Sequence, residues 1–185
     1  MGSKGISLGR KVAGDGNTSF LIMRHNRLRV TGVSLEDALA FLAWDSPTMT
    51  AHTAPSPYVT SASYDQSSHS GLYAWDRDAG TYWGTSGGGS GPQWTKLDCG
   101  TDSPVVTGFT VTSYAGYGPK NVILQGSNDD SGWTDLYSTL LDNNGDVQSF
   151  SFSNGVAYRY YRLYCTDSYT AGNQATYGIT LSGYR

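Results

Sequence analysis

The sequence is poor in charge and in cysteine. Charged residues make up 15% of the 185 positions, whereas a typical soluble domain has about a quarter. The formal net charge of −3 gives no general attraction to nucleic acid or to acidic membranes. Cys99 and Cys165 are the only cysteines; they exclude a disulfide framework and leave one disulfide or two thiols. We expect two buried free thiols.

Long hydrophobic runs are also missing. No stretch approaches the roughly 18 apolar residues that a membrane-spanning helix needs, and the first residues lack the apolar core of a secretory signal. The opening MGSKGIS is similar to a myristoylation signal, but Ile6 stands where Ser or Thr is required. We therefore expect neither membrane insertion nor classical secretion.

Glutamate is absent from residues 46–185, which weakens the case for an enzyme. Glycosidases place two carboxylic acids about 5–10 Å apart, and the aspartates here lie mostly in turn-like sequences. Residues 84–88 match Gly-x-Ser-x-Gly, but they lie in a glycine-rich loop and not at a strand–turn–helix corner. His25, His52 and His69 are too scattered to indicate zinc. We predict that the protein is not an enzyme.

The residues that are abundant indicate a β protein. The chain has 24 glycines, 14 tyrosines and 5 tryptophans, a composition typical of short strands and many turns. Runs with partial period-two alternation are separated by Gly, Asn and Asp; they are QWTKLDCG, VVTGFTVTSY, NVILQGSN, VQSFSFS, YRYYRLYC and YGITLSGY. Such a series without intervening helices favours an antiparallel sandwich or barrel. We expect Trp83, Trp94 and Trp133 to fill its core.

Residues 1–45 differ from the rest. They carry six basic and four acidic residues, a net charge of +2, while residues 46–185 carry the other six basic and eleven acidic residues, a net charge of −5. Residues 18–30 suggest extended segments. Residues 34–44 predict the only helix, with Ser34 as its cap and an apolar stripe. Prolines in residues 46–58 place the domain boundary near residue 46.

Six motifs follow one another along the chain: AWDRDAGTYW, PQWTKLDCG, VVTGFTV, PKNVILQGSNDDSGWTDL, YRYYRLY and ITLSGY. Their order resembles the discoidin family, the coagulation-factor C-type domain that is also used as a carbohydrate-binding module. They extend over residues 46–185 and do not reach residues 1–45. The resemblance implies an all-β, antiparallel, galactose-binding-like jelly-roll β-sandwich, to which we add an N-terminal extension containing a short helix.

The stretch AWDRDAGTYW offers a candidate metal site. Asp76, Asp78 and Thr81 place hard oxygens at positions i, i+2 and i+5, and calcium takes six to eight such ligands. In the family that the chain resembles, this loop commonly wraps a structural calcium. The family's acidic ligand near the C-terminus corresponds here to Thr180, which has no carboxylate. The alternative is that the aspartates close the loop through Asx turns without an ion.

The loops expected at one end of the sandwich carry candidate sugar-binding residues. A sugar has an apolar face that suits an aromatic ring and hydroxyls that suit amide or imidazole groups. The candidates are Tyr64, His69, Tyr114, Tyr117, Tyr169, Asn173 and Gln174. Lipid-binding members of the family display apolar spikes and basic surroundings on these loops, whereas here the loops are polar and the domain is acidic, which disfavours anionic membranes.

These features predict a module that binds a cell-surface glycan or polysaccharide, with receptor binding and cell adhesion as its biological use. A basic N-terminal segment without an export signal favours display on a virion surface, as in a phage fibre or spike. Residues 1–45 would then dock to a capsid or tail protein, and a homo-oligomer, preferably a trimer, would form. The alternative is a free lectin or an accessory module of a polysaccharide-active enzyme, extracellular by a non-classical route.

Overall fold

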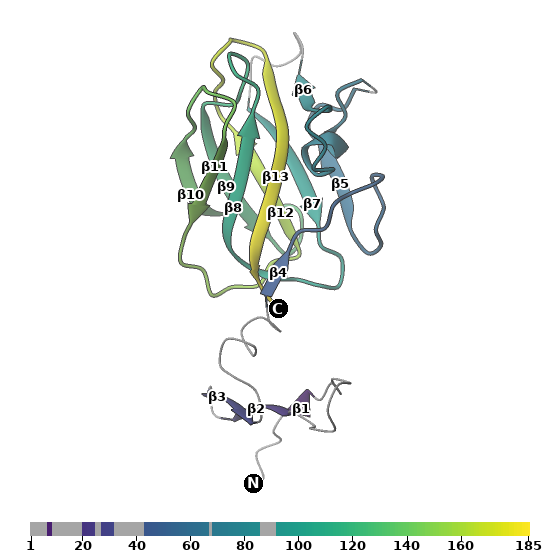
Figure 1. Cartoon of the computed structure of the whole chain (residues 1–185), viewed down its shortest axis with the longest axis vertical. Coiled ribbons are helices and arrows are strands. Elements are labelled where there is room, and N and C mark those ends of the chain that lie inside the picture. Colours follow the sequence, from purple (N-terminus) through teal and green to yellow (C-terminus); the bar gives the residue numbers. More distant parts are fainter. Residues whose placement is uncertain (1–6, 9–19, 25–26, 32–42, 67, 86–91) are drawn as a thin grey trace. The chain divides into compact units, whose positions relative to one another are not determined.

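The computed structural model describes residues 7–8, 20–24, 27–31, 43–66, 68–85 and 92–185. The chain divides into two compact units, Met1–Ala43 and Trp44–Arg185 (Figure 1). Among the described residues, no helix is long or apolar enough to cross a bilayer.

The first unit contains a small three-stranded sheet. Its antiparallel strands lie in the order β1 (Ser7–Leu8), β2 (Phe20–Arg24) and β3 (Arg27–Thr31). β2 and most of β3 fall within residues 18–30, which were predicted to be extended, and β3 ends one residue beyond them.

The helix predicted for residues 34–44 is wrong at its C-terminal end, and its other residues, 34–42, lie outside the described residues. Ala43–Asp45 forms strand β4, at the edge of a sheet beside β13. Its burial alternates along the strand, and the Trp44 side chain is 5% exposed. Pairing with β13 and burial of Trp44 therefore override the local helical pattern, as tertiary contacts commonly do.

The second unit is a sandwich of two antiparallel sheets, which confirms the predicted fold class. One sheet has the order β10-β9-β12-β7-β5, and the other has β11-β8-β13-β4, with β6 also paired to β13. Figure 1 shows β13 running through the second sheet between β8 and β4. The strands are β5 (Val59–Ala62), β6 (Trp83–Thr85), β7 (Gln93–Asp98), β8 (Val105–Ser113), β9 (Asn121–Ser127), β10 (Thr134–Leu140), β11 (Val147–Ser151), β12 (Tyr160–Cys165) and β13 (Gln174–Tyr184). A 3-10 turn, η1, spans Gly71–Ala74.

Alternation of side chains along the strands builds the core. Burial is strictly alternate in β7 and β12, so that Leu97 and Leu163 point inward from neighbouring strands. Phe109 and Leu181 are buried from the opposite sheet. A sheet with one buried face requires this period of two.

The two cysteines are buried free thiols, as expected from the sequence. Burial raises the pKa of both Cys99 and Cys165 well above the ordinary thiol value. Both thiols are therefore neutral at physiological pH and act as small apolar core residues.

Only one of the three tryptophans predicted for the core lies there. Trp83 is fully buried, and its indole N–H donates to the carbonyl of Tyr64 at 2.9 Å. Trp94 and Trp133 are only partly buried. Trp94 alternates with the inward residues of β7 and so lies on the outer face of its sheet. The other tryptophans in the core are Trp44 and Trp75, which the sequence analysis did not predict to lie there.

Candidate functional site

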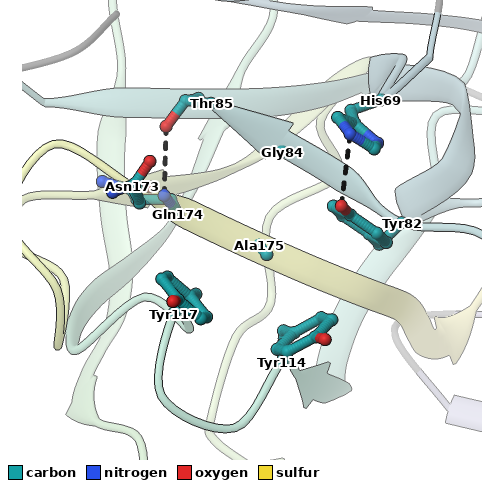
Figure 2. Close-up of a pocket in the computed structure, with 9 residues that line it drawn as sticks. All are labelled: His69, Tyr82, Gly84, Thr85, Tyr114, Tyr117, Asn173, Gln174 and Ala175. Atoms are coloured by element: carbon teal, nitrogen blue, oxygen red, sulfur yellow. Dashed lines mark hydrogen bonds between the residues drawn. The ribbon is translucent and has the colours of Figure 1, made fainter. Parts of the chain in front are cut away.

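A cavity of about 220 Å³ opens where β6 pairs with the start of β13. Residues from four parts of the chain line it and are shown in Figure 2: His69, Tyr82, Gly84, Thr85, Tyr114, Tyr117, Asn173, Gln174 and Ala175. We call this cavity the pocket.

Strand pairing fixes the β6 side of the pocket. Gln174 lies opposite Thr85, and Ala175 lies opposite Gly84. The backbone N–H of Gln174 donates to the Thr85 hydroxyl at 3.1 Å (Figure 2). A side chain at Gly84 would place its Cβ 2.9 Å from the ring of Tyr82. Glycine at this position therefore leaves room for that ring.

The turn that follows β8 is tied to β13 on both sides. The N–H of Tyr114 donates to the carbonyl of Ala175 at 3.0 Å, and the N–H of Ala175 donates to the carbonyl of Tyr117 at 2.8 Å. The turn closes through a bond from the N–H of Tyr117 to the carbonyl of Tyr114 at 3.1 Å. Gly116 adopts φ +88°, a conformation that glycine accepts without strain. The two tyrosines are thus held by backbone contacts.

The aromatic rings pack against each other as a group. The ring of His69 stacks on that of Tyr82 with centroids 4.3 Å apart, and the His69 Nε2 lies 3.2 Å from the Tyr82 hydroxyl. The ring of Tyr114 meets those of Tyr82 and Tyr117 edge-on, at 5.5 and 5.8 Å. On its other side it stacks on Tyr177 at 5.2 Å. Tyr117 remains 47% exposed, so it offers a ring surface to a ligand.

The polar groups of the pocket include an imidazole, but no carboxylate, ammonium or guanidinium group. None of the nine lining residues is an aspartate, glutamate, lysine or arginine. Gln174 is 5% exposed, and its side-chain oxygen has no hydrogen-bond partner within the described structure. A buried oxygen without a donor carries a free-energy cost that a ligand hydroxyl or amide can relieve.

The structure brings five of the seven predicted sugar-binding residues together. His69, Tyr114, Tyr117, Asn173 and Gln174 line the pocket.

The other two, Tyr64 and Tyr169, do not line the pocket. The Tyr169 hydroxyl donates to the carbonyl of Leu141 at 2.6 Å, and the Tyr64 hydroxyl accepts a bond from the Gln66 amide. Both hydroxyls are therefore used within the protein.

Sequence reasoning missed Tyr82 and Thr85. Tyr82 precedes the buried Trp83, and alternation along an extended segment places neighbouring side chains on opposite faces. This pattern could have identified Tyr82 as a residue facing away from the core. Residues 86–88 of the Gly-x-Ser-x-Gly match lie outside the described residues.

The predicted metal loop is closed by its own hydrogen bonds. Asp76 accepts from the N–H of Asp78 at 3.0 Å and from the Thr81 hydroxyl at 2.7 Å. The Thr81 hydroxyl also lies 3.2 Å from the carbonyl oxygen of Asp78, and Asp78 caps the N–H of Gly80 at 2.8 Å. These contacts are those of Asx turns, which close the loop through its own side chains. Groups of three or more His, Cys, Asp or Glu side chains suited to a metal are absent from the described part of the chain.

Comparison with protein families agrees with the fold. The model of the F5/8 type C domain matches residues 58–179, which include every residue that lines the pocket. The chain belongs to this family, which confirms the resemblance to discoidin domains. No curated protein matches the sequence significantly.

Solved structures with the same fold include several carbohydrate-binding modules. The family 32 module of NanJ from Clostridium perfringens, in complex with galactose, has a TM-score of 0.63 and 14% identity, and the match covers 76% of this chain and 99% of that one. Another C. perfringens module, CpGH89CBM32-5 in complex with GalNAc-β-1,3-galactose, has a TM-score of 0.59 and 16% identity, covering 67% and 94%.

A third neighbour is a chitosan-binding module in complex with chitotriose, from a chitosanase/glucanase of Paenibacillus sp. IK-5. Its TM-score is 0.56 and its identity 26%, and the match covers 66% of this chain and 94% of that one. The three ligands differ in sugar and in charge, so the common fold does not by itself specify the sugar.

Proposed function

We propose that residues 44–185 form a carbohydrate-binding module that holds its ligand in the pocket without transforming it. The observation that carries this proposal is the pocket itself, where a partly exposed group of aromatic rings borders buried, neutral polar groups. Sugar complexes among structures of the same fold support it.

The geometry suggests how a sugar would be held. The exposed ring of Tyr117 offers a flat apolar surface to the C–H face of a pyranose. The amides of Asn173 and Gln174 and the imidazole of His69 offer donors and acceptors to its hydroxyls. Backbone hydrogen bonds join the turn at Tyr114–Tyr117 to Ala175 at the start of β13. Because these segments are already held in place, binding a sugar costs little conformational entropy, which favours affinity.

The pocket lacks the groups that glycoside hydrolysis requires. That reaction uses two positioned carboxylic acids, and no carboxylate lines the pocket among the described residues. We therefore propose a binding role alone for this domain.

A matched pair of variants tests the proposal. Tyr117 and Tyr184 are both exposed tyrosines, at 47% and 42%, but only Tyr117 lines the pocket. On a glycan array followed by titration calorimetry, Tyr117→Ala should weaken binding at least about tenfold, which corresponds to about 1.4 kcal/mol. Tyr184→Ala should leave it unchanged. Equal effects of the two substitutions on sugar affinity would show that the pocket is not the binding site.

The biological setting is a separate proposal with two alternatives. In the first, the module is displayed on a virion as part of a phage fibre or spike, docked to a capsid or tail protein through residues 1–45, and trimeric. In the second, it is a free lectin or an accessory module of a polysaccharide-active enzyme, outside the cell. The basic charge of residues 1–45 supports a docking role for them.

Light scattering separates these settings. The truncated chain should begin at residue 43, because removing β4 would take Trp44 out of the core. Virion display predicts that the full chain is an oligomer and that the chain 43–185 is a monomer. A full chain that is monomeric and has no affinity for particles would reject it.

We also propose calcium as a structural ion of the 76–81 loop. Asp76, Asp78 and Thr81 would supply ligands, and the ion would stabilise the fold. A site that binds only the folded state stabilises it by about 2.7 kcal/mol when calcium is at 100 times its Kd. Calcium should therefore raise the thermal midpoint above that in a chelator, and Asp76→Asn should remove the difference. An identical midpoint with calcium and with chelator would favour closure by Asx turns alone.

A further inference from the structure

The pocket is lined by polar side chains, but by no aspartate, glutamate, lysine or arginine. Its polar side chains are two carboxamides, a threonine, a histidine and tyrosines. In the described structure, the cation–ring contacts fall on rings that do not line the pocket.

From this we infer that the pocket takes a single uncharged sugar ring and discriminates against uronic acids and against amino sugars with a free ammonium group. The inference rests on the proposed function and adds to it the chemical class of the ligand. It separates this chain from neighbours of the same fold, whose ligands include chitotriose and an unsaturated mannuronic acid.

The discrimination follows from desolvation. A charged ligand group loses its hydration when it enters a pocket, and it regains that free energy only from an opposite charge or from several aligned hydrogen bonds. The residues lining the pocket provide amides, hydroxyls and one imidazole, but no carboxylate, ammonium or guanidinium group. A neutral hydroxyl or N-acetyl group pays a much smaller penalty and finds partners of matching polarity.

Gln174 is the residue on which this preference depends most. Its side chain is almost completely buried, and its oxygen lacks a hydrogen-bond donor in the described structure. A carboxamide presents one acceptor and one donor group, both uncharged. Glutamate has the same shape but would place a negative charge at this position, opposite Thr85 in the strand pair.

The size of the cavity supports recognition of one ring. Pockets for drug-sized ligands have volumes of about 300–1,000 Å³, whereas this cavity has about 220 Å³. The rings of Tyr114 and Tyr117 border it from the turn after β8.

The test uses the full chain and matched sugars that differ at one substituent. Galactose, N-acetylgalactosamine, galacturonic acid and galactosamine are titrated at pH 7, with the corresponding glucose series in parallel. In whichever series binds, the neutral and N-acetylated sugars should bind at least about tenfold more tightly than the acid and the amine. A charged sugar that binds as tightly as its neutral counterpart would overturn the inference while leaving carbohydrate binding intact.

A charge substitution gives a second readout. Gln174→Glu should weaken neutral sugars and shift the preference toward the amine by at least about tenfold. Ser138→Glu, an exposed position on β10, adds the same charge outside the pocket and should leave the preference unchanged. If a folded wild-type chain binds no sugar of either series or of the glycan array, the proposed function itself fails and this inference fails with it. The wild-type comparison does not depend on whether the Gln174 variant folds.

Discussion

Aromatic side chains gather both in the pocket and on the outer face of the sheet β10-β9-β12-β7-β5, but their neighbours differ in the two places. On the outer face, lysine and arginine lie over the rings. In the pocket, the rings contact one another, and no charged residue lines the cavity among the described residues. We call the residues of the outer face the outer-face cluster; they are Trp94, Lys96, Trp133, Tyr160, Arg162 and Tyr164.

Arg162 shows how the outer-face cluster is organised. Its guanidinium lies 4.0 Å from the ring centre of Trp133 and 4.9 Å from that of Tyr164. Its Nε donates to the side-chain oxygen of Gln125 at 2.7 Å. Burial lowers the pKa of Arg162 from its ordinary value, and the group remains charged at physiological pH because arginine starts so high.

Lys96 of β7 also lies over two aromatic rings of the outer-face cluster. Its ammonium lies 5.3 Å from the ring centre of Trp94 and 5.5 Å from that of Tyr160, and it forms an ion pair with Asp130. Cations over aromatic faces are attracted by the ring quadrupole. The rings of the outer-face cluster thus already contact cations of the protein itself. The exposed ring of Tyr117, in contrast, is available to a ligand.

The largest effect is expected when a tryptophan of the core is compared with one of the outer-face cluster. Trp83→Ala removes a fully buried side chain and should lower the free energy of unfolding by about 3–5 kcal/mol. Trp94→Ala removes a partly buried ring under Lys96 and should cost about 1 kcal/mol. Chemical denaturation measures both, and similar losses would contradict the assignment of the two side chains to core and surface.

An intermediate effect is expected from Arg162. Arg162→Ala removes two cation–ring contacts and the bond to Gln125, and should lower the free energy of unfolding by about 1–2 kcal/mol. Sugar affinity should stay unchanged because Arg162 does not line the pocket. Arg162→Lys should restore part of the stability. A loss of sugar binding without a loss of stability would move the binding surface to this face.

The smallest effect on stability is expected from an ion pair at the edge of the outer-face cluster, and it depends on pH. Arg159 forms two bonds of 2.9 Å with Asp98. Burial alone raises the pKa of Asp98, but the bonds from Arg159 and from the N–H of Gly100 outweigh it, so the pKa lies below its ordinary value.

Since the folded state lowers this pKa, the carboxylate contributes stability above the unfolded value of about 4 and loses it as the pH falls through the folded value. Arg159 is 47% exposed, so the contribution should be below about 1 kcal/mol. Asp98→Asn should be slightly less stable at pH 7 and should show a weaker decline between about pH 5 and pH 2 in acid titrations. An unchanged decline would mean that the pair does not contribute.

The sequence predicted the sandwich because its signal is local. Alternation along β7 and β12 is visible in the residues themselves, and the turns between strands carry Gly, Asn and Asp. It predicted most of the pocket because His69, Tyr114 and Gln174 lie in polar, tyrosine-bearing loops.

What the sequence did not predict depends on contacts between distant residues. Trp133 is large and apolar, and its contact with Arg162 of the distant strand β12 places it outside the core. Trp94, by contrast, shares the outer face of β7 with Lys96, and alternation along that strand could have predicted its position. The strand at Ala43–Asp45 depends on pairing with β13, far away in the chain. No local pattern contains that information.

The measurement that tests the central claim most directly is a sugar titration followed by amide chemical shifts. A neutral sugar that binds should shift the amides of Gly84, Tyr114 and Ala175 around the pocket. It should leave Lys96 and Arg162 in the outer-face cluster unchanged. Shifts confined to the outer-face cluster, or shifts absent from the pocket while the sugar binds, would contradict the account.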